Sequence, residues 1–420
     1  MAHPSIYNSA FRNVPKTGVI YVTEQAGQHG FSLATATNWS NMGQGMPECG
    51  PLIYSPNRIN SILLEDMVHE YAPVAGILDL RAAIADMYNR RFRQGMKSKY
   101  TAENVAVSAG GRTALTRIAA SLGSINLGHF LPDYTAYEEL LDIFRFFNPI
   151  PIIRDPEKNY LYSTDELKKE IMGKGLAALL FSNPCNPTGQ VVAEDELCKW
   201  LSIGQELECA FIIDEFYSHY IWNNQGSIVT AAKYITDVNK DQVIIIDGLT
   251  KNWRYAGWRI AWTLGPKSII EAISSAGSFL DGGAPHPLQR AAIPLLEDHN
   301  IEAETKAIQT IFGKKRKFLI QQCRAMGMVV ANEPQGGFYV FADLSKLPKE
   351  IATGIDFFQA ALKKQVICVP GMFFDINPGK RRPINFSRFN NYIRLSFGPC
   401  YDAIKAGCDR LHHMINSFAS

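Results

Sequence analysis

A lysine, Lys251, follows a short apolar run, and two arginines, Arg254 and Arg259, come soon after it. Neighbouring cations disfavour the charged form of a lysine, so its amine loses a proton more easily than a free one. A neutral lysine is a nucleophile that forms a Schiff base with an aldehyde. Arg259 would hold a phosphate through two parallel hydrogen bonds. A lone lysine beside a turn is usually a surface residue, but further segments of the chain favour the same site.

A carboxylate, Asp214, ends the apolar run that begins at Phe211. A buried charge there is costly unless it meets a cation. A protonated pyridine nitrogen is such a partner, and the pairing lets the ring act as an electron sink. Tyr217 and Asn186 would share the phenolate oxygen of such a ring. Asn186 lies in Ser182-Asn-Pro-Cys-Asn-Pro-Thr-Gly-Gln190, whose two Asn-Pro pairs form a rigid turn after a strand.

Three weaker signals fit the same chemistry. Gly110 and Gly111 lie between a strand and a helix, where backbone N–H groups can approach a phosphate, although such turns are common. Tyr134 follows the next strand and could stack on a planar ring, although a packing tyrosine is the commoner role. Arg394 lies inside an apolar strand and needs a carboxylate, either from a ligand or from a structural salt bridge.

These residues follow short apolar runs that alternate with helical patterns. The runs are 105–107, 128–131, 150–153, 176–181, 211–214, 243–246 and 260–262. Apolar strands that alternate with helices imply an α/β fold with a mainly parallel sheet between helices. Ligands bind beyond the carboxyl ends of such strands, where most of the motifs fall.

The pattern predicts two domains. Helical spacing marks residues 77–93, and from about residue 300 a long charged helix (298–326) opens a smaller α+β region. Strands are predicted there at 336–341, 366–369 and 392–397, with helices near 354–364 and at the end. Residues 1–60 read as irregular. We predict an N-terminal arm and part of the small domain at 1–60, a large cofactor-binding domain at 61–300 and a small C-terminal domain at 301–420.

The composition is that of an ordinary globular chain. The 420 residues are 46% hydrophobic and 20% charged, with a net charge of +2, which predicts neither nucleic-acid nor membrane partners. No apolar stretch reaches about 18 residues, and the opening residues 1–8 lack a leader pattern. The eight scattered cysteines and nine histidines show no metal-site spacing, so we predict a cytoplasmic protein without a metal.

Together the motifs resemble the pyridoxal-phosphate-dependent aminotransferases of class I/II, the aspartate aminotransferase superfamily of fold type I. The resemblance runs from Asn41-Met-Gly-Gln-Gly-Met-Pro-Glu48 to Arg394 and so covers nearly the whole chain. It implies pyridoxal 5′-phosphate as cofactor and a homodimer with sites at the interface. It also implies that Gly45 touches the substrate carboxylate and that Tyr71 reaches the phosphate in the neighbouring subunit.

The resemblance assigns a role to each motif residue. Lys251 would form the internal aldimine and then move the proton. Asp214 would pair with the pyridine nitrogen, and Arg394 would hold the substrate α-carboxylate. The other cofactor contacts would come from Gly110, Gly111, the backbone of Arg112, Tyr134, Asn186, Tyr217, Thr250 and Arg259, with Asn186 also next to the substrate.

Two residues depart from the family pattern. Gly248 stands where a serine usually precedes the lysine, so one phosphate hydroxyl is missing. Arg112 occupies a place in the glycine turn that often holds a small or polar residue, and its side chain would replace the lost contact or face solvent. Both departures concern the grip on the phosphate rather than the reaction type.

The predicted reaction is transfer of an amino group from an L-amino acid to a 2-oxo acid. An alternative on the same site is elimination or cyclisation of an arginine-derived amino acid in a biosynthetic pathway. A regulator fused to a DNA-binding module would need roughly 60 or more residues before the domain, and the pattern already begins near residue 41.

The substrate side chain is predicted from one loop. Dicarboxylate-specific relatives supply a second arginine from a loop that corresponds here to residues 278–289. That loop contains no arginine but does contain Asp281. A carboxylate there repels acidic side chains and attracts cationic ones, so neutral or basic donors are predicted. The alternative is that Asp281 only caps the glycine turn.

Overall fold

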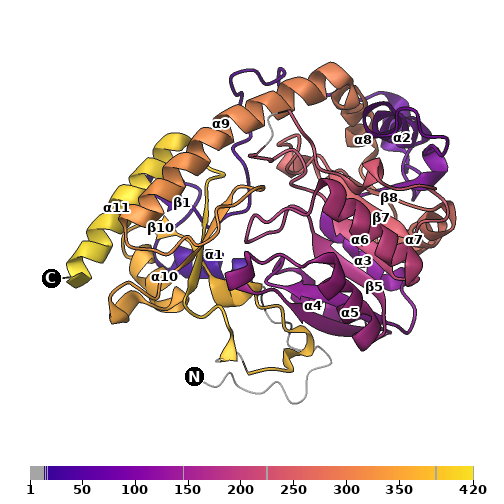
Figure 1. The fold of residues 1–420 in the computed structure, drawn as a ribbon. Helices are drawn as coiled ribbons and strands as arrows, with labels where there is room; N and C mark the ends of the chain where they lie inside the picture. The colour runs from indigo at the N-terminus through magenta and orange to yellow at the C-terminus, as the bar shows by residue number, and fades with distance from the viewer. Residues whose placement is uncertain are drawn as a thin grey trace, which may run out of the picture.

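The computed structural model describes residues 14, 16, 18–144, 146–223, 226–383 and 386–419. Residues 1–8, for which no leader was predicted, lie outside this part of the chain. In the described part, no helix is long and apolar enough to cross a membrane. Figure 1 shows two lobes joined by one long helix.

The larger lobe is built on a seven-stranded sheet in the order β2-β8-β7-β6-β5-β3-β4. All seven predicted runs form these strands. Only β8 runs antiparallel to its neighbours, so the α/β prediction with a mainly parallel sheet is confirmed. The strands are β2 Val105–Ser108, β3 Asn126–Leu131, β4 Asn148–Ile153, β5 Leu176–Ser182, β6 Ala210–Asp214, β7 Val243–Gly248 and β8 Ala261–Leu264.

Helices cover both faces of this sheet, which explains why its strands are apolar on both sides. In β6, Ile212 joins one buried cluster, whereas Phe211 and Ile213 join the other. The first cluster includes side chains of α3 Gly111–Ser121, α4 Tyr137–Ile143 and α7 Lys267–Leu280. The second includes those of α2 Leu78–Phe92, α5 Thr164–Lys174, α6 Glu194–Glu206 and α8 His286–Ala292.

The smaller lobe lies around two short sheets at one end of the long helix α9 Asp298–Ala325 (Figure 1). One sheet is antiparallel, in the order β11-β12-β9, and the other pairs β1 with β10 in parallel. Besides α9, the strands and α-helices of the smaller lobe from residue 40 onward are β1 Ser40–Asn41, β9 Tyr339–Asp343, α10 Gly354–Leu362, β10 Val366–Ile367, β11 Val369–Pro370, β12 Tyr392–Ser396 and α11 Tyr401–Ala419.

Two expectations about the elements need correction. Residues 1–60 include a helix, α1 Gly18–Gln28, which buries Val22 and Ala26 and places Tyr21 against Phe373 with ring centroids 5.5 Å apart. The predicted strand 366–369 is two strands, because the chain leaves the sheet of β1 after Ile367 and joins β12 from Val369. The exact domain boundaries at residues 60 and 300 stay a prediction.

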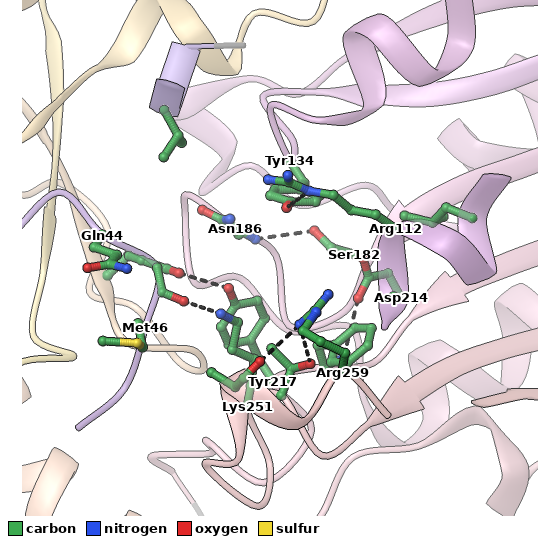
Figure 2. A pocket seen from close by; sticks show the side chains of 18 of the residues that line it. Gln44, Met46, Arg112, Tyr134, Ser182, Asn186, Asp214, Tyr217, Lys251 and Arg259 are labelled. Carbon is green, nitrogen blue, oxygen red and sulfur yellow. Dashed lines mark hydrogen bonds between the residues drawn. The ribbon is translucent and has the colours of Figure 1, made fainter. Parts of the chain in front are cut away.

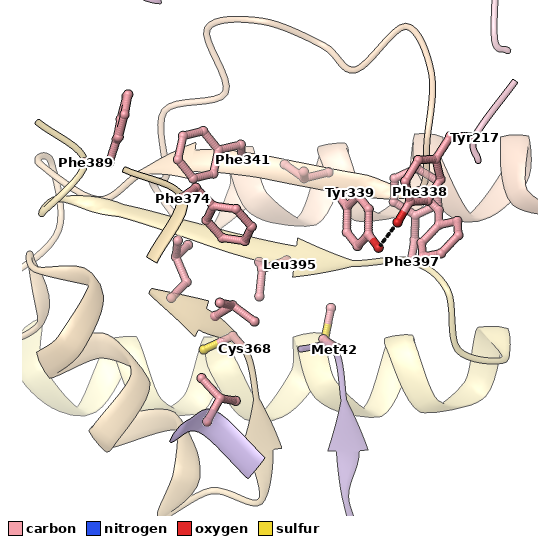
Figure 3. Close-up of a cluster of buried hydrophobic side chains, with 14 of the residues drawn as sticks. Met42, Tyr217, Phe338, Tyr339, Phe341, Cys368, Phe374, Phe389, Leu395 and Phe397 are labelled. Carbon is pink, nitrogen blue, oxygen red and sulfur yellow. Dashed lines mark hydrogen bonds between the residues drawn. The ribbon is translucent and has the colours of Figure 1, made fainter. Parts of the chain in front are cut away.

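A cluster of aromatic side chains connects the two lobes next to the functional motifs (Figure 3). Tyr217 comes from the segment after β6, Phe338 immediately precedes β9, and Tyr339 is the first residue of β9. The ring centroid of Tyr217 lies 5.3 Å from that of Phe338 and 5.7 Å from that of Tyr339. Contacts of this kind fix the relative position of the two lobes at this point.

Candidate active site

The predicted motif residues line one cavity of about 530 Å³ at the carboxyl edge of the large sheet (Figure 2). Parallel strands β5, β6 and β7 deliver their following residues to the same edge, which is why distant motifs meet there. The predicted residues in its wall are Gly45, Gly111, Arg112, Tyr134, Asn186, Asp214, Tyr217, Thr250, Lys251, Arg259 and Arg394.

Lys251 lies in the turn after β7, and its side chain points into the cavity (Figure 2). Its amine donates a hydrogen bond to the carbonyl of Gly45. Burial lowers the pKa of Lys251 to about 8, and the nearby guanidinium groups of Arg259, Arg394 and Arg112 add to this shift. A larger fraction of the amine is therefore neutral near pH 7 than for a free lysine, as nucleophilic attack requires.

Arg254 does not act on Lys251 in the way the spacing predicted. Its guanidinium is fully buried and turned to Glu304, with Nε donating to Oε1. Nη1 donates to the carbonyls of Glu48 at 2.9 Å and Gly50 at 2.7 Å. Its charge is neutralised by Glu304, so this part of the prediction is corrected: of the two arginines that follow Lys251, only Arg259 lowers its pKa.

Asp214 presents a buried carboxylate at the end of β6. Its Oδ2 accepts a hydrogen bond from Tyr137 Oη at 3.0 Å, and its Oδ1 accepts one from the backbone N–H of Phe216 at 3.3 Å. Burial raises the pKa of Asp214 to about 6, against the effect of these bonds. Burial makes the ionised form of Asp214 unfavourable, and a cationic ring nitrogen in the cavity would stabilise that form. The carboxylate therefore fits a pyridinium partner.

Arg394 is buried at the other side of the cavity, where β12 runs beside β9. Nη1 donates to Asn186 Oδ1 at 2.9 Å and Nη2 to the carbonyl of Gly43 at 2.6 Å, while Nε is buried without a partner. No carboxylate within the described residues forms an ion pair with it. A buried guanidinium that keeps its charge without a protein anion fits a carboxylate ligand.

The two tyrosines near Arg394 form a second polar pair. The hydroxyls of Tyr217 and Tyr339 lie 2.8 Å apart, and the Arg394 guanidinium lies 4.2 Å from the centre of the Tyr339 ring. Asn186 directs its side-chain oxygen to Arg394, and its backbone N–H donates to Ser182 Oγ at 3.2 Å. The position of Asn186 is therefore fixed from both sides.

The opposite end of the cavity fits a phosphate. Gly110 has a φ of 90°, and a Cβ there would lie 2.0 Å from Arg259 Nη2. A Cβ on Gly111, where α3 begins, would lie 2.4 Å from the Phe216 ring. Glycines therefore let Arg259 and the first N–H groups of α3 approach the same point, and a helix N-terminus favours an anion. Thr250 Oγ1 lies 3.5 Å from Arg259 Nη1.

The structure gives a reason for the glycine at position 248. A Cβ there would lie 2.6 Å from both Ala261 Cα and the Ile260 carbonyl oxygen, because β8 passes close to β7. A serine side chain therefore does not fit without a backbone shift. Arg112, the second departure, lines the cavity and donates from Nε to the Tyr134 hydroxyl at 3.3 Å.

Three predicted residues are not part of the wall of this cavity: Gly110, which lies against Arg259, and the more distant Tyr71 and Asp281. The Tyr71 side chain is fully exposed, and its predicted role in a neighbouring subunit stays a prediction. Asp281 accepts a hydrogen bond from Arg117 Nε at 2.8 Å and another from the Gly283 N–H at 2.9 Å. Arg117 neutralises this group within the same subunit, and the Gly283 contact caps the glycine turn as the alternative predicted, so a role toward a basic substrate stays a prediction.

Several residues of the cavity were not found by sequence reasoning. They include Val19, Gln44, Met46, Leu115, Ser182, Phe216 and Tyr339. Tyr339 could have been found from the sequence, because it closely follows the glycine pair Gly336-Gly337 and starts a strand. Val19 could not, because α1 was not predicted. In the described part, no group of three or more metal-ligating side chains is found.

Comparison with known proteins gives one consistent family. Residues 38–411 match the family model described as aminotransferase class I and II. An aspartate aminotransferase of Sulfurisphaera tokodaii is 24% identical over 387 residues, covering 90% of each chain. A (5-formylfuran-3-yl)methyl phosphate transaminase of Methanocaldococcus jannaschii is 26% identical over 84% of this chain and 85% of that protein.

Solved structures show the same fold. The structure of an aspartate aminotransferase from Thermus thermophilus with maleate superposes with a TM-score of 0.77. The two sequences are 19% identical, and the match covers 96% of this chain and 100% of that one. A likeness at this identity concerns the fold and does not extend to the substrate.

Proposed function

Because this chain belongs to the class I and II aminotransferases, enzymes that use pyridoxal 5′-phosphate, we propose that it moves an amino group from an L-amino acid to a 2-oxo acid. One observation carries the proposal: Lys251, Asp214 and Arg394 line the same cavity. The three side chains supply a nucleophilic amine, an anion for a ring nitrogen and a cation for a carboxylate.

The cavity supports a defined orientation of the cofactor. When bound, the cofactor supplies an aldehyde and an electron-withdrawing ring. The N-terminus of α3 and Arg259 would hold its phosphate, and Asp214 would face its ring nitrogen. Tyr134 would lie against the ring, and Asn186 and Tyr217 would reach its phenolate oxygen. This orientation leaves the Lys251 amine next to the aldehyde.

Lys251 would act twice in the reaction. First, its neutral amine binds the cofactor covalently, which the pKa of about 8 supports. Once free of the cofactor, the same amine would take the proton from the substrate α-carbon, and the cofactor ring, when bound, would supply the sink for the electrons left behind. Burial and the surrounding guanidinium groups keep this amine a base in the free state.

Arg394 would fix the substrate for that proton transfer. A bidentate contact with the α-carboxylate restrains the α-carbon in front of Lys251, which converts binding energy into orientation. Asn186 and Tyr339 hold the guanidinium in place through a hydrogen bond and a ring contact. The same contact would accept the 2-oxo acid in the second half of the reaction.

The wall around the substrate side chain supports a neutral amino donor. Asp214 is the sole acidic residue among the described residues of this wall, and it already faces the cofactor. Val19, Met46 and Leu115 add apolar surface. Of the two classes predicted from the sequence, neutral and basic, the neutral one is therefore proposed, since Asp281 is paired with Arg117.

We also propose a homodimer in a reducing compartment. Exposed apolar side chains gather in the segment before α2, with Leu63 79%, Met67 60% and Tyr71 100% exposed. Exposure of this kind favours a protein interface. All eight cysteines are free, which supports the predicted cytoplasmic location.

Half-reaction spectra test the proposed activity. The purified enzyme is mixed with single amino acids, and visible absorbance is followed without a second substrate. A transaminase converts its cofactor to the amine form and stops, and a 2-oxo acid then restores the starting spectrum. Elimination or cyclisation would instead release product continuously with no oxo acid present. That result, confirmed by product mass, would overturn the proposed transfer.

A further inference from the structure

A second cavity, of about 410 Å³, lies between the end of β4 and the segment that leads into β12. Arg154, Asp155 and Tyr162 line it from the larger lobe, and Arg388 and Phe389 line it from the smaller one. It shares no lining residue with the active-site cavity. It is therefore a separate hollow with its own chemistry.

Arg154 is the unusual residue of this cavity. Its side chain is 3% exposed, and both Nε and Nη1 are buried without a hydrogen-bond partner. The guanidinium lies 3.9 Å from the centre of the Phe130 ring, and no carboxylate within the described residues forms an ion pair with it. A buried charge without hydrogen-bonded compensation is costly, so such a group indicates a missing anion.

The remaining charges leave the cavity positive. The nearby Asp133, outside the cavity wall, accepts hydrogen bonds from Ser182 Oγ and the Tyr134 N–H, and burial raises its pKa to about 7, so that it offsets only part of the Arg154 charge near neutral pH.

The other charged groups of the wall are two acids and two bases. Lys158 pairs with Glu166 at 2.6 Å, so these two charges cancel. Asp155 uses Oδ1 to accept the Glu157 N–H at 2.9 Å and thereby caps a helical turn. Arg388 is exposed and forms no ion pair among the described residues. Within the wall, the charges of Arg154 and Arg388 are therefore opposed by one carboxylate, that of Asp155, which already accepts a backbone hydrogen bond.

We propose that this cavity is a second anion-binding site, which takes a phosphate or carboxylate group between Arg154 and Arg388. Guanidinium groups bind both kinds of anion with paired hydrogen bonds. The volume admits inorganic phosphate or a short organic acid.

The location connects this site to the substrate arginine. Asp133, beside Arg154, accepts from Ser182 Oγ, and this oxygen accepts from the Asn186 N–H at 3.2 Å. Asn186 in turn accepts from Arg394. Arg388 lies in the segment that continues into β12, the strand of Arg394. An anion in the second cavity would therefore contact Arg154, which lies beside this hydrogen-bond chain, and Arg388, four residues before the start of β12.

Thermal unfolding of the holoenzyme tests the proposal, with inorganic phosphate as probe and ionic strength held constant with chloride. Because Arg394 also binds anions, the comparison uses Arg394→Met as the parent, with the cofactor occupying the other phosphate site. We expect phosphate to raise the Tm of this parent in a saturable way. Adding Arg154→Met should remove the rise, whereas adding Arg381→Met, a nearby exposed arginine outside the cavity, should not.

Without phosphate, Arg154→Met should be at least as stable as its parent, because an apolar side chain replaces an unpaired buried charge. If that variant fails to fold, Arg388→Met serves instead, since its side chain is exposed. Crystals soaked in selenate should show an anomalous peak between the two arginines. The same phosphate response in parent and Arg154→Met or Arg388→Met, or an empty cavity in selenate, would overturn the proposal.

Discussion

The hydroxyl of Tyr137 donates a hydrogen bond to Asp214 Oδ2 at 3.0 Å, and the tyrosine side chain is completely buried. Burial raises the pKa of Asp214 to about 6, and this bond works in the opposite direction. Tyr137 therefore helps to keep the carboxylate ionised and directed at the cavity. It comes from the first residue of α4, one turn after Tyr134.

Tyr137→Phe should raise the pKa of Asp214, because a bond to the charged form is lost. Such a bond contributes about 1.5–3 kcal/mol, so activity should fall roughly tenfold or more and the acid limb of the pH profile of kcat should move upward by about 1–2 units. Tyr134→Phe is the matched control, since it loses only the contact with Arg112. If the acid limb of the pH profile does not move in Tyr137→Phe, Tyr137 does not keep the Asp214 carboxylate ionised.

Lys251 should carry the cofactor. Borohydride reduction of the purified enzyme should fix the label on the peptide that contains Lys251, as read by mass spectrometry. Lys251→Ala should abolish turnover, because both the covalent bond and the mobile proton depend on this amine. Lys267→Ala, a surface lysine paired with Glu103, should keep full activity. Label on any other lysine contradicts the assignment.

Arg394→Ala should raise KM for amino acids and 2-oxo acids alike while the protein keeps its cofactor absorbance. The loss in kcat/KM should correspond to about 2–4 kcal/mol, because a charge-assisted pair of bonds disappears. Arg394→Lys should recover only part of this loss, since an ammonium does not form the paired contact. Equal use by the wild type of amines without a carboxylate would count against the role.

Gly248→Ser should not improve the grip on the cofactor, although it restores a hydroxyl at this place. Its Cβ meets the backbone of β8, so the variant should lose about 1–3 kcal/mol of stability. Gly248→Ala is the control, because it carries the same Cβ without the hydroxyl and should be equally destabilised. Denaturant unfolding and cofactor titration give the two readouts. A stable Gly248→Ser with tighter cofactor binding contradicts the steric argument.

Asp281→Ala should affect stability rather than substrate choice. Arg117 is fully buried, and removing its partner should cost about 3–5 kcal/mol at pH 7. The pairing lowers the pKa of Asp281, so its stabilisation is present above the unfolded pKa of about 3.9 and is lost as pH falls further. Wild type and variant should therefore converge in denaturant unfolding as the pH falls through the lowered pKa of Asp281. A selective loss of activity with basic amino acids would restore the substrate role.

Sequence reasoning succeeded where one physical rule dominated. Apolar runs such as 243–246 form buried strands, and motifs such as Asp214 meet Lys251 because parallel strands end at one edge. It failed where a side chain finds a distant partner. Nothing local shows that Asp281 faces Arg117 or that Arg254 turns to Glu304. Side-chain direction in such turns is decided by tertiary packing, which no single segment encodes.

The buried pair of Arg254 and Glu304 carries a consequence for how this family diverges. Glu304 is 2% exposed on α9 and also pairs with Arg58 at 3.5 Å, so loss of Glu304 leaves two arginines without their carboxylate, whereas loss of Arg254 leaves Glu304 paired with Arg58 alone. Replacement of Glu304 alone should therefore be the most costly change, and an apolar replacement of this cluster has to include Arg58 as well. In descendants of this chain, positions 58, 254 and 304 should therefore covary.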